Sequence, residues 1–309
     1  MTYRIDPAND LTTEVRSIAR EQIDQAIALL SDQGADRHEA IHLSRRRLKR
    51  ARAMLRLVRA ANEDFARTEI ARYRDVARSL SGARDAAALV EAFDAFRRDR
   101  PRKLGGKTGA EVHRALAARR DRIAGEPSNL EEEAGKAIAE CRAGRAALDA
   151  LHLPARPEAA ARLLARGAAR TYKKARRALD EARADPAPER VHVLRKRVND
   201  HLFQLRLLRG LDPKAFKSRR KQVSALAQHL GHHHDLCVMR ARLAAEPELL
   251  PDTRTRDRLA ALIAERIDEL DAQILTEAEP LFSKKPDKWR AGIEGLYLAA
   301  ARPSYSHRR

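Results

Sequence analysis

The chain has 309 residues, enough for one large hydrophobic core or for two cores of about 150 residues each. Its 63 Lys and Arg residues outnumber 44 Asp and Glu residues, which gives a formal charge of +19 and an isoelectric point near 10.6. A small domain needs a net charge of only about 2 to 8 in magnitude for solubility, so this excess favours a polyanionic partner. The chain has two cysteines far apart in sequence, which argues against a disulfide scaffold. It has no N-terminal apolar region and no apolar run of about 18 residues, which argues against a secreted or membrane-spanning protein. We therefore expect a soluble cytoplasmic protein.

Ala, Arg, Leu and Glu dominate the composition, aromatic residues are 4%, and no segment alternates apolar with polar residues, so we expect an all-α fold. Clusters of Gly and Pro divide the chain into predicted helices. In the first half these cover residues 11–31, 36–62, 64–80, 84–98, 110–124 and 129–151, with a loop over 101–109. In the second half they cover residues 157–184, 189–208, 214–230, 234–245, 252–277 and 289–301. Pro154 and Pro157 mark a seam, so we predict two tandem four-helix bundles over 1–155 and 156–309.

The two predicted bundles repeat each other after a shift of 150 positions. The shift needs no insertion between residues 16 and 85. A duplicated scaffold would repeat leucines, but the matched positions here are largely cationic. They place His42, Arg45, Arg46 and Arg47 on His192, Arg195, Lys196 and Arg197, and Arg16 and Arg20 on Arg166 and Arg170. The repeat therefore predicts a pseudo-symmetric pair of bundles with a duplicated anion site.

The repeated cations fall on single faces of the predicted helices. The helix that contains residues 41–58 carries His42, Arg45, Arg46, Lys49, Arg52 and Arg56; its counterpart carries His192, Arg195, Lys196 and Arg206; and the helix before the counterpart carries Arg166, Arg170, Lys173, Lys174 and Arg177. Like charges four residues apart destabilise a helix by a few tenths of a kcal/mol per pair, so such faces need a counter-charge. Acidic residues on neighbouring helices are one source of it. The repeat favours the other source, an anion bound in a groove where the basic faces converge.

Two motifs in each half make the chain resemble the CHAD family, the conserved histidine α-helical domain. The first half has His42, Arg45, Arg46, Lys49 and Arg52, followed by Leu80, Arg84 and Asp85; the second has His192, Arg195 and Lys196, followed by Leu230, His234 and Asp235. The resemblance covers nearly the whole chain. It implies two helical bundles flanking a basic central cavity that binds inorganic polyphosphate, association with polyphosphate granules, and a cavity lining that includes Arg84 and His234. Asn199, Asp200 and Leu202 depart from the pattern of the first half.

The charge pattern suits polyphosphate on physical grounds as well. Cations repeated along a helix can engage successive phosphoryl groups, Arg through paired hydrogen bonds and Lys as a point charge. Release of counterions predicts a steep salt dependence. Protonation of His42 and His192 would strengthen the contact with phosphate, so we expect tighter binding as pH falls through the histidine range.

Three other interpretations remain open. A nucleic-acid-binding protein could use the same groove, but Tyr172 and Phe203 are the only aromatic residues near the cationic faces, which argues against single-strand binding and leaves duplex DNA. A phosphotransfer enzyme would need clustered carboxylates for Mg²⁺, which these faces lack, so we expect no catalysis and no cofactor. His229 with His232 or His233 has the spacing of two metal ligands without a visible third, so we expect no metal site. The oligomeric state is left open.

Overall fold

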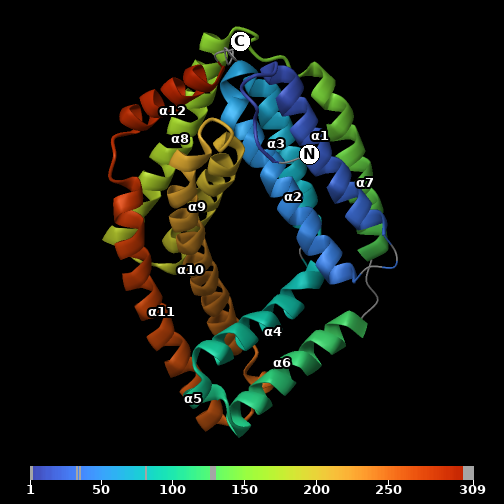
Figure 1. The fold of residues 1–309 in the computed structure, drawn as a ribbon. Helices are drawn as coiled ribbons and strands as arrows, with labels where there is room; N and C mark the ends of the chain where they lie inside the picture. The colour runs from blue at the N-terminus through green and yellow to red at the C-terminus, as the bar shows by residue number, and fades with distance from the viewer. Residues whose placement is uncertain (1–2, 33, 35, 81, 126–129, 302–309) are drawn as a thin grey trace, which may run out of the picture.

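The computed structural model describes residues 3–32, 34, 36–80, 82–125 and 130–301, and within these ranges it contains helices and no strand (Figure 1). The all-α prediction is confirmed. The first half contains α1 (Leu11–Ser31), α2 (Arg37–Val58), η1 (Arg59–Ala61), α3 (Glu63–Ser79), α4 (Gly82–Asp99), α5 (Pro101–Leu104), α6 (Lys107–Gly125), α7 (Leu130–Ala147) and η2 (Leu148–Ala150). The second contains α8 (Pro157–Ala184), α9 (Pro188–Leu208), α10 (Pro213–Ala245), η3 (Pro247–Leu249), α11 (Thr253–Phe282) and α12 (Pro286–Ala301). None of the helices in these ranges is long and apolar enough to cross a membrane.

Several helices begin where a side chain caps free backbone N–H groups. The carboxylate of Asp10 accepts a hydrogen bond from Thr13 N at 2.8 Å, and the carboxylate of Asp36 accepts from two backbone N–H groups at the start of α2. Asp212 caps α10 in the same way. Helices α8, α9 and α10 have proline in the first turn, where the missing N–H costs nothing. Capping therefore explains why the predicted helix starts lie close to the observed ones.

The segment over 101–109 was predicted to be a loop, and this prediction is wrong. Residues 101–104 form α5, and α6 begins at Lys107. Pro101 fits the first turn of α5 because its ring fixes a helical φ. Gly109 lets α6 start directly beside the end of α5, since a Cβ at this position would lie 1.7 Å from the carbonyl oxygen of Leu104.

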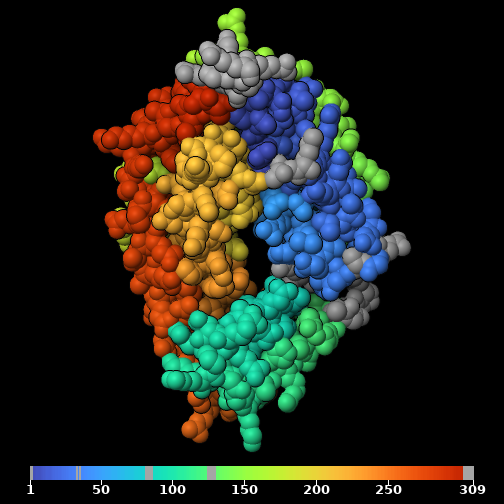
Figure 2. Space-filling model, viewed as in Figure 1, coloured from blue at the N-terminus to red at the C-terminus, as the bar shows by residue number. Residues whose placement is uncertain are grey.

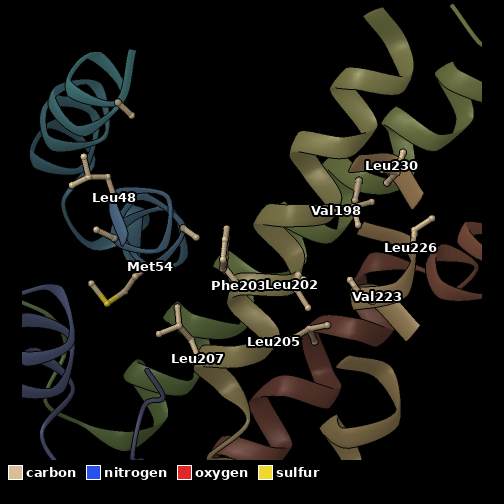
Figure 3. Packing of buried hydrophobic residues seen from close by; sticks show 14 of the residues in the cluster. Leu48, Met54, Val198, Leu202, Phe203, Leu205, Leu207, Val223, Leu226 and Leu230 are labelled. Carbon is tan, nitrogen blue, oxygen red and sulfur yellow. The ribbon is translucent and has the colours of Figure 1, made fainter. Parts of the chain in front are cut away.

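The structure also joins two predicted helices, 214–230 and 234–245, into the single helix α10. Buried residues continue at helical spacing through Gly231, from Leu226 and Leu230 to His233 and Leu236. One uninterrupted face of α10 therefore packs against α9 and α11, and this packing outweighs the cost of about 1 kcal/mol for a glycine inside a helix. Figure 3 shows side chains of α9 and α10, among them Val198 and Leu226, lying together in this core.

The helices form two packed groups that are joined into a ring. Helices α1, α2, α3 and α7 pack together, and α8 to α12 form the second group. Helices α4, α5 and α6 extend away from the first group, and α4 packs against α10 of the second (Figure 1). The space-filling view shows an opening through the molecule, bordered by α2, by α9 with α10, and by α4 (Figure 2). The reach of the α4–α6 arm thus creates a central opening that lies between the two halves.

Two contacts join the halves of the ring. On one side, α2 packs against α8 and α9, and the side-chain amide of Gln204 donates a hydrogen bond to Ala53 O at 3.4 Å. On the other side, ion pairs connect the α4–α6 arm to the second half. Arg119 Nε lies 2.6 Å from the Glu246 carboxylate, Lys103 Nζ lies 2.8 Å from Glu265, and Arg266 Nε lies 2.9 Å from Asp99. Helix packing closes the ring at both ends, and several ion pairs reinforce the contact between the arm and the second half.

Candidate anion-binding site

Helix α2, which carries the first predicted cationic face, borders the central opening (Figure 2). Arg46 and Lys49 are exposed, and His42 and Arg45 are half-buried. Lys49 lies near enough to His192 of α9 for its charge to lower the pKa of that histidine. Cations from the two halves therefore lie close together where α2 packs against α9.

His192 and His234 form a stacked pair at the meeting of α9 and α10. Their ring centroids are 4.4 Å apart, and the planes are inclined by 27°. Burial, with Lys196, Arg195 and Lys49 nearby, lowers the pKa of His192 to about 4. Burial, Arg195 and His192 itself lower the pKa of His234 to about 3. Both rings are neutral at pH 7 in the free protein, and an anion beside them would favour their protonation.

Arg195 and Lys196 extend this part of the site. Burial lowers the pKa of Arg195, and the carboxylate of Asp235 opposes that effect. Lys196 is exposed on the same helix. A pocket of about 370 Å³ continues from His234 and Asp235 to Arg119, between α4, α6 and α10. The imidazoles of His192 and His234 thus lie between the exposed Lys196 and the pocket, whose wall includes Arg119 and Arg242.

A second group of charges forms where α2, α8 and α9 meet. The guanidinium NH1 of Arg56 lies 2.9 Å from Oδ1 of Asp200. Burial raises the pKa of the Asp200 carboxyl, while Arg56, Arg197 and Arg52 oppose that rise. Lys174 of α8 also lies near this group, and burial together with Arg197 lowers its pKa. Burial, with Arg56 nearby, lowers the pKa of Arg52 to about 10.

A third group lies on α2 and α9 around Arg206. Burial lowers the pKa of Arg206, and among the neighbouring charges Arg46 adds most to the effect. Burial and then Arg47 lower the pKa of Arg50 to about 10. Arg220 of α10 also lies near Arg206. Among the described residues, no carboxylate pairs with Arg50 or Arg206, so this group has an unbalanced positive charge.

Other predicted site residues have different roles or lie on other surfaces. Arg16 donates hydrogen bonds to the carbonyl oxygens of Leu151 and Asp149, at 2.9 and 2.7 Å, and Arg20 pairs with the Asp149 carboxylate. These two arginines hold the segment after α7 against α1, so the structure gives them a local partner away from the central opening. The side chain of Arg84 lies outside the described residues.

On α8 the predicted cations are exposed, and they differ in the charged groups that lie near them. Arg170 lies near Lys174, one turn away on the same helix. Arg177 donates from Nε to Glu181 at 2.8 Å, one turn along its own helix. Arg166 and Lys173 are exposed, with no ion pair among the described residues. The basic face of α8 therefore contributes Lys174 to the charges around Asp200, and its other predicted cations are exposed.

Helical periodicity does not identify Arg47, Arg50, Arg197 and Arg220 as site residues. Arg50 and Arg197 lie off the cationic face chosen from helical periodicity, and Arg220 lies on a third helix. The repeat could have found Arg197, because it matches Arg47 after the shift of 150 positions. Nothing in the sequence places Arg220 beside Arg206, because that contact depends on how α9 packs against α10.

The histidines considered as metal ligands are paired with carboxylates. His229 Nδ1 lies 2.9 Å from Glu277, and His233 Nε2 lies 3.1 Å from Asp271. The carboxylate of Asp271 and the thiol of Cys237 raise the pKa of the buried His233 to about 9, against the effect of burial. No group of three or more His, Cys, Asp or Glu residues that could hold a metal ion occurs within the part of the chain that the structure describes.

Comparisons with known proteins agree with the geometry. The family model described as CHAD domain matches residues 17–244. The crystal structure of the CHAD domain from the plant Ricinus communis superimposes with a TM-score of 0.55 at 18% sequence identity, over 94% of this chain and 93% of that chain. No match was found among curated proteins. The structural similarity supports the fold, and the family match covers well over half of the chain. The chain therefore belongs to the CHAD domain family.

Proposed function

We propose that the chain binds inorganic polyphosphate through the cations around its central opening and carries out no chemical step on it. The observation that carries this proposal is the convergence of charges from both halves, with Lys49 of α2 near His192 of α9 and Arg46 of α2 near Arg206 of α9. Polyphosphate binding is a general property of CHAD domains, which supports the same conclusion. Polyphosphate is a flexible chain of anions, so it can contact such separated cations one after another.

A nucleic acid is the second candidate, because its phosphates would also suit this charge. Proteins that bind single strands commonly stack bases on exposed aromatic rings. The two aromatic residues beside the cationic faces are buried, Tyr172 at 0% and Phe203 at 7% exposure. They are therefore not available for stacking, and this observation favours polyphosphate over single-stranded nucleic acid.

A competition experiment tests the proposal. Labelled long-chain polyphosphate is bound to the protein over a salt series and displaced with unlabelled polyphosphate, duplex DNA, single-stranded RNA or orthophosphate. We expect polyphosphate to compete best, and the affinity to fall steeply with salt because each neutralised phosphate releases counterions. Stronger competition by DNA or RNA would favour the second candidate. Shortening of the labelled chain with release of orthophosphate in the presence of Mg²⁺ would show that the protein is an enzyme.

A pair of double variants locates the binding site. Lys49→Gln with Lys196→Gln removes two exposed charges at the opening, and we expect polyphosphate affinity to fall about ten-fold. Lys136→Gln with Lys288→Gln removes the same net charge from α7 and α12, where both lysines are exposed. We expect less than about a two-fold change for this control. Equal losses in the two variants would mean that net charge alone drives binding.

If the protein binds polyphosphate in the cell, it should gather where polyphosphate accumulates. We therefore propose that the protein is cytoplasmic and associates with polyphosphate granules. A fluorescent fusion of the full chain should colocalise with granules, and the Lys49→Gln, Lys196→Gln variant should do so less. Diffuse fluorescence of the unmodified fusion in cells that contain granules would contradict this proposal.

A further inference from the structure

The internal repeat places two charge clusters in equivalent positions, and they differ at one residue. We name the cluster of Arg47, Arg50 and Arg206 the open cluster, and the cluster of Arg197, Asp200 and Arg56 the closed cluster. A shift of 150 positions relates Arg47 to Arg197, Arg50 to Asp200 and Arg56 to Arg206. In both clusters α2 and α9 supply the three side chains. The open cluster takes two side chains from α2 and one from α9, whereas the closed cluster takes two from α9 and one from α2. A pseudo-two-fold axis between α2 and α9 produces this relation.

In the open cluster the arginines have no acidic partner among the described residues. Arg47 and Arg50 both donate from NH1 to the amide oxygen of the buried Gln22, at 3.5 and 3.4 Å. That oxygen is neutral, so it satisfies hydrogen bonds without balancing charge. Arg206 lies over the ring of Phe203, with 5.9 Å between its guanidinium carbon and the ring centroid. Within the described residues, no carboxylate therefore balances the positive charge of this cluster, and a bound anion would do so.

In the closed cluster a carboxylate takes the equivalent place. Asp200 lies 2.9 Å from Arg56, and its side chain is 16% exposed. Arg197, Arg52 and Lys174 also act on this carboxylate from α9, α2 and α8. One buried anion thus sits among four cations from three helices, which is the environment that a phosphoryl group would need.

We propose that Asp200 is a built-in substitute for a phosphoryl group, so that polyphosphate binds first at the open cluster and reaches Arg56 only by displacing the Asp200 carboxylate. This inference rests on the proposed function, and it explains how the protein would discriminate between short and long polyphosphate chains. Because the Asp200 carboxylate is attached to the protein, it competes with a phosphoryl group for Arg56 at a high effective concentration. A short phosphate has few contacts with which to overcome it, whereas a long chain anchored at the open cluster has many. Asp200 therefore makes the protein select for long chains.

The first test compares two arginines that the repeat makes equivalent. Arg206→Gln removes a cation from the open cluster, and we expect the affinity for long-chain polyphosphate to fall about ten-fold. Arg56→Gln removes the matching cation from the closed cluster, and we expect a loss of less than about three-fold, because Asp200 already occupies that arginine. Circular dichroism and thermal melting confirm that each variant is folded. Equal losses for the two variants would overturn the proposal.

The second test removes the carboxylate itself. Asp200→Asn keeps the shape of the side chain, and we expect tripolyphosphate to bind about five- to ten-fold more tightly and long chains to gain less. Asp121→Asn makes the same charge change on α6, where Asp121 pairs with Arg120 at the surface, and we expect less than a two-fold effect there. Isothermal titration at fixed salt measures all four affinities. An Asp200→Asn variant that binds tripolyphosphate no more tightly than the unmodified protein would reject the substitute role.

The results of these binding experiments distinguish failure of the Asp200 proposal from failure of the proposed function. If the unmodified protein does not bind long-chain polyphosphate, the proposed function and the role of Asp200 are both wrong. If it binds, and Asp200→Asn brings no gain while Arg206→Gln and Arg56→Gln lose affinity equally, only the role of Asp200 fails.

Discussion

At the scale of single residues, His192 and His234 couple anion binding to pH. Their pKa values of about 4 and 3 mean that both rings are neutral in the free protein above pH 5. A phosphoryl group beside them would raise both pKa values, so binding is accompanied by proton uptake. The same shift destabilises the free protein in acid. Between the ordinary histidine pKa of 6.5 and about 4, the unfolded chain binds more protons than the folded one, so stability falls as pH falls through this window.

We therefore expect polyphosphate affinity to rise as pH falls from 8 to 5, by at most about ten-fold per pH unit for each proton taken up. Binding measured at constant ionic strength checks this slope. His192→Gln combined with His234→Gln should flatten the profile. His113→Gln should leave it unchanged, because His113 lies on α6 and pairs with Asp94. A flat profile for the unmodified protein would show that neither imidazole takes up a proton on binding.

At the scale of helices, Gly167 fixes the crossing of α8 over the end of α2. A Cβ at this position would lie 1.8 Å from the carbonyl oxygen of Leu57, so no other residue fits without moving one helix. This crossing brings Lys174, two turns further along α8, to Arg56 and Arg59. The close approach of the two backbones therefore positions part of the cationic site.

Gly167→Ala should lower the free energy of unfolding by about 1–3 kcal/mol, because overpacking forces the backbones apart. Urea denaturation measures the change. Gly135→Ala on α7 is the matched control, since no heavy atom lies within 4 Å of a Cβ there. It should raise the free energy of unfolding by about 0.5–1 kcal/mol, because alanine favours the helix. A destabilisation of equal size at both positions would contradict the role of the crossing.

At the scale of the whole molecule, the ring depends on ion pairs between the α4–α6 arm and the second half. The pair of Arg119 and Glu246 is the best shielded of these, with side-chain exposures of 10% and 20%. Arg119 donates to both carboxylate oxygens, and the network holds the pKa of Glu246 at about 2. Two hydrogen bonds of this kind fix direction as well as distance. The arm is therefore held by a directional charge contact in addition to the packing of α4 against α10.

Arg119→Glu should open the ring, because like charges then face each other between α6 and η3. We expect a larger radius of gyration in solution scattering and weaker polyphosphate binding, since the pocket beside His234 loses one wall. The exchange variant, Arg119→Glu with Glu246→Arg, restores opposite charges and should recover part of both properties. A closed ring in Arg119→Glu would mean that apolar contacts between α4 and α10 suffice to hold the arm.

The sequence by itself determined the all-α fold and the duplicated cations, because capping residues, helical spacing and a repeat without insertions are local or periodic properties. Helices α1 and α8 follow the predicted bounds for this reason. Only the tertiary structure decided which cations meet. Arg16 and Arg20 match the repeat as well as His42 does, yet the segment after α7 supplies their partners. Asp200 departs from the repeat, yet it lies against Arg56 from the other half of the chain. A contact between residues so distant in sequence depends on how helices pack and on what burial does to charge, and neither is encoded in the spacing of residues along one helix.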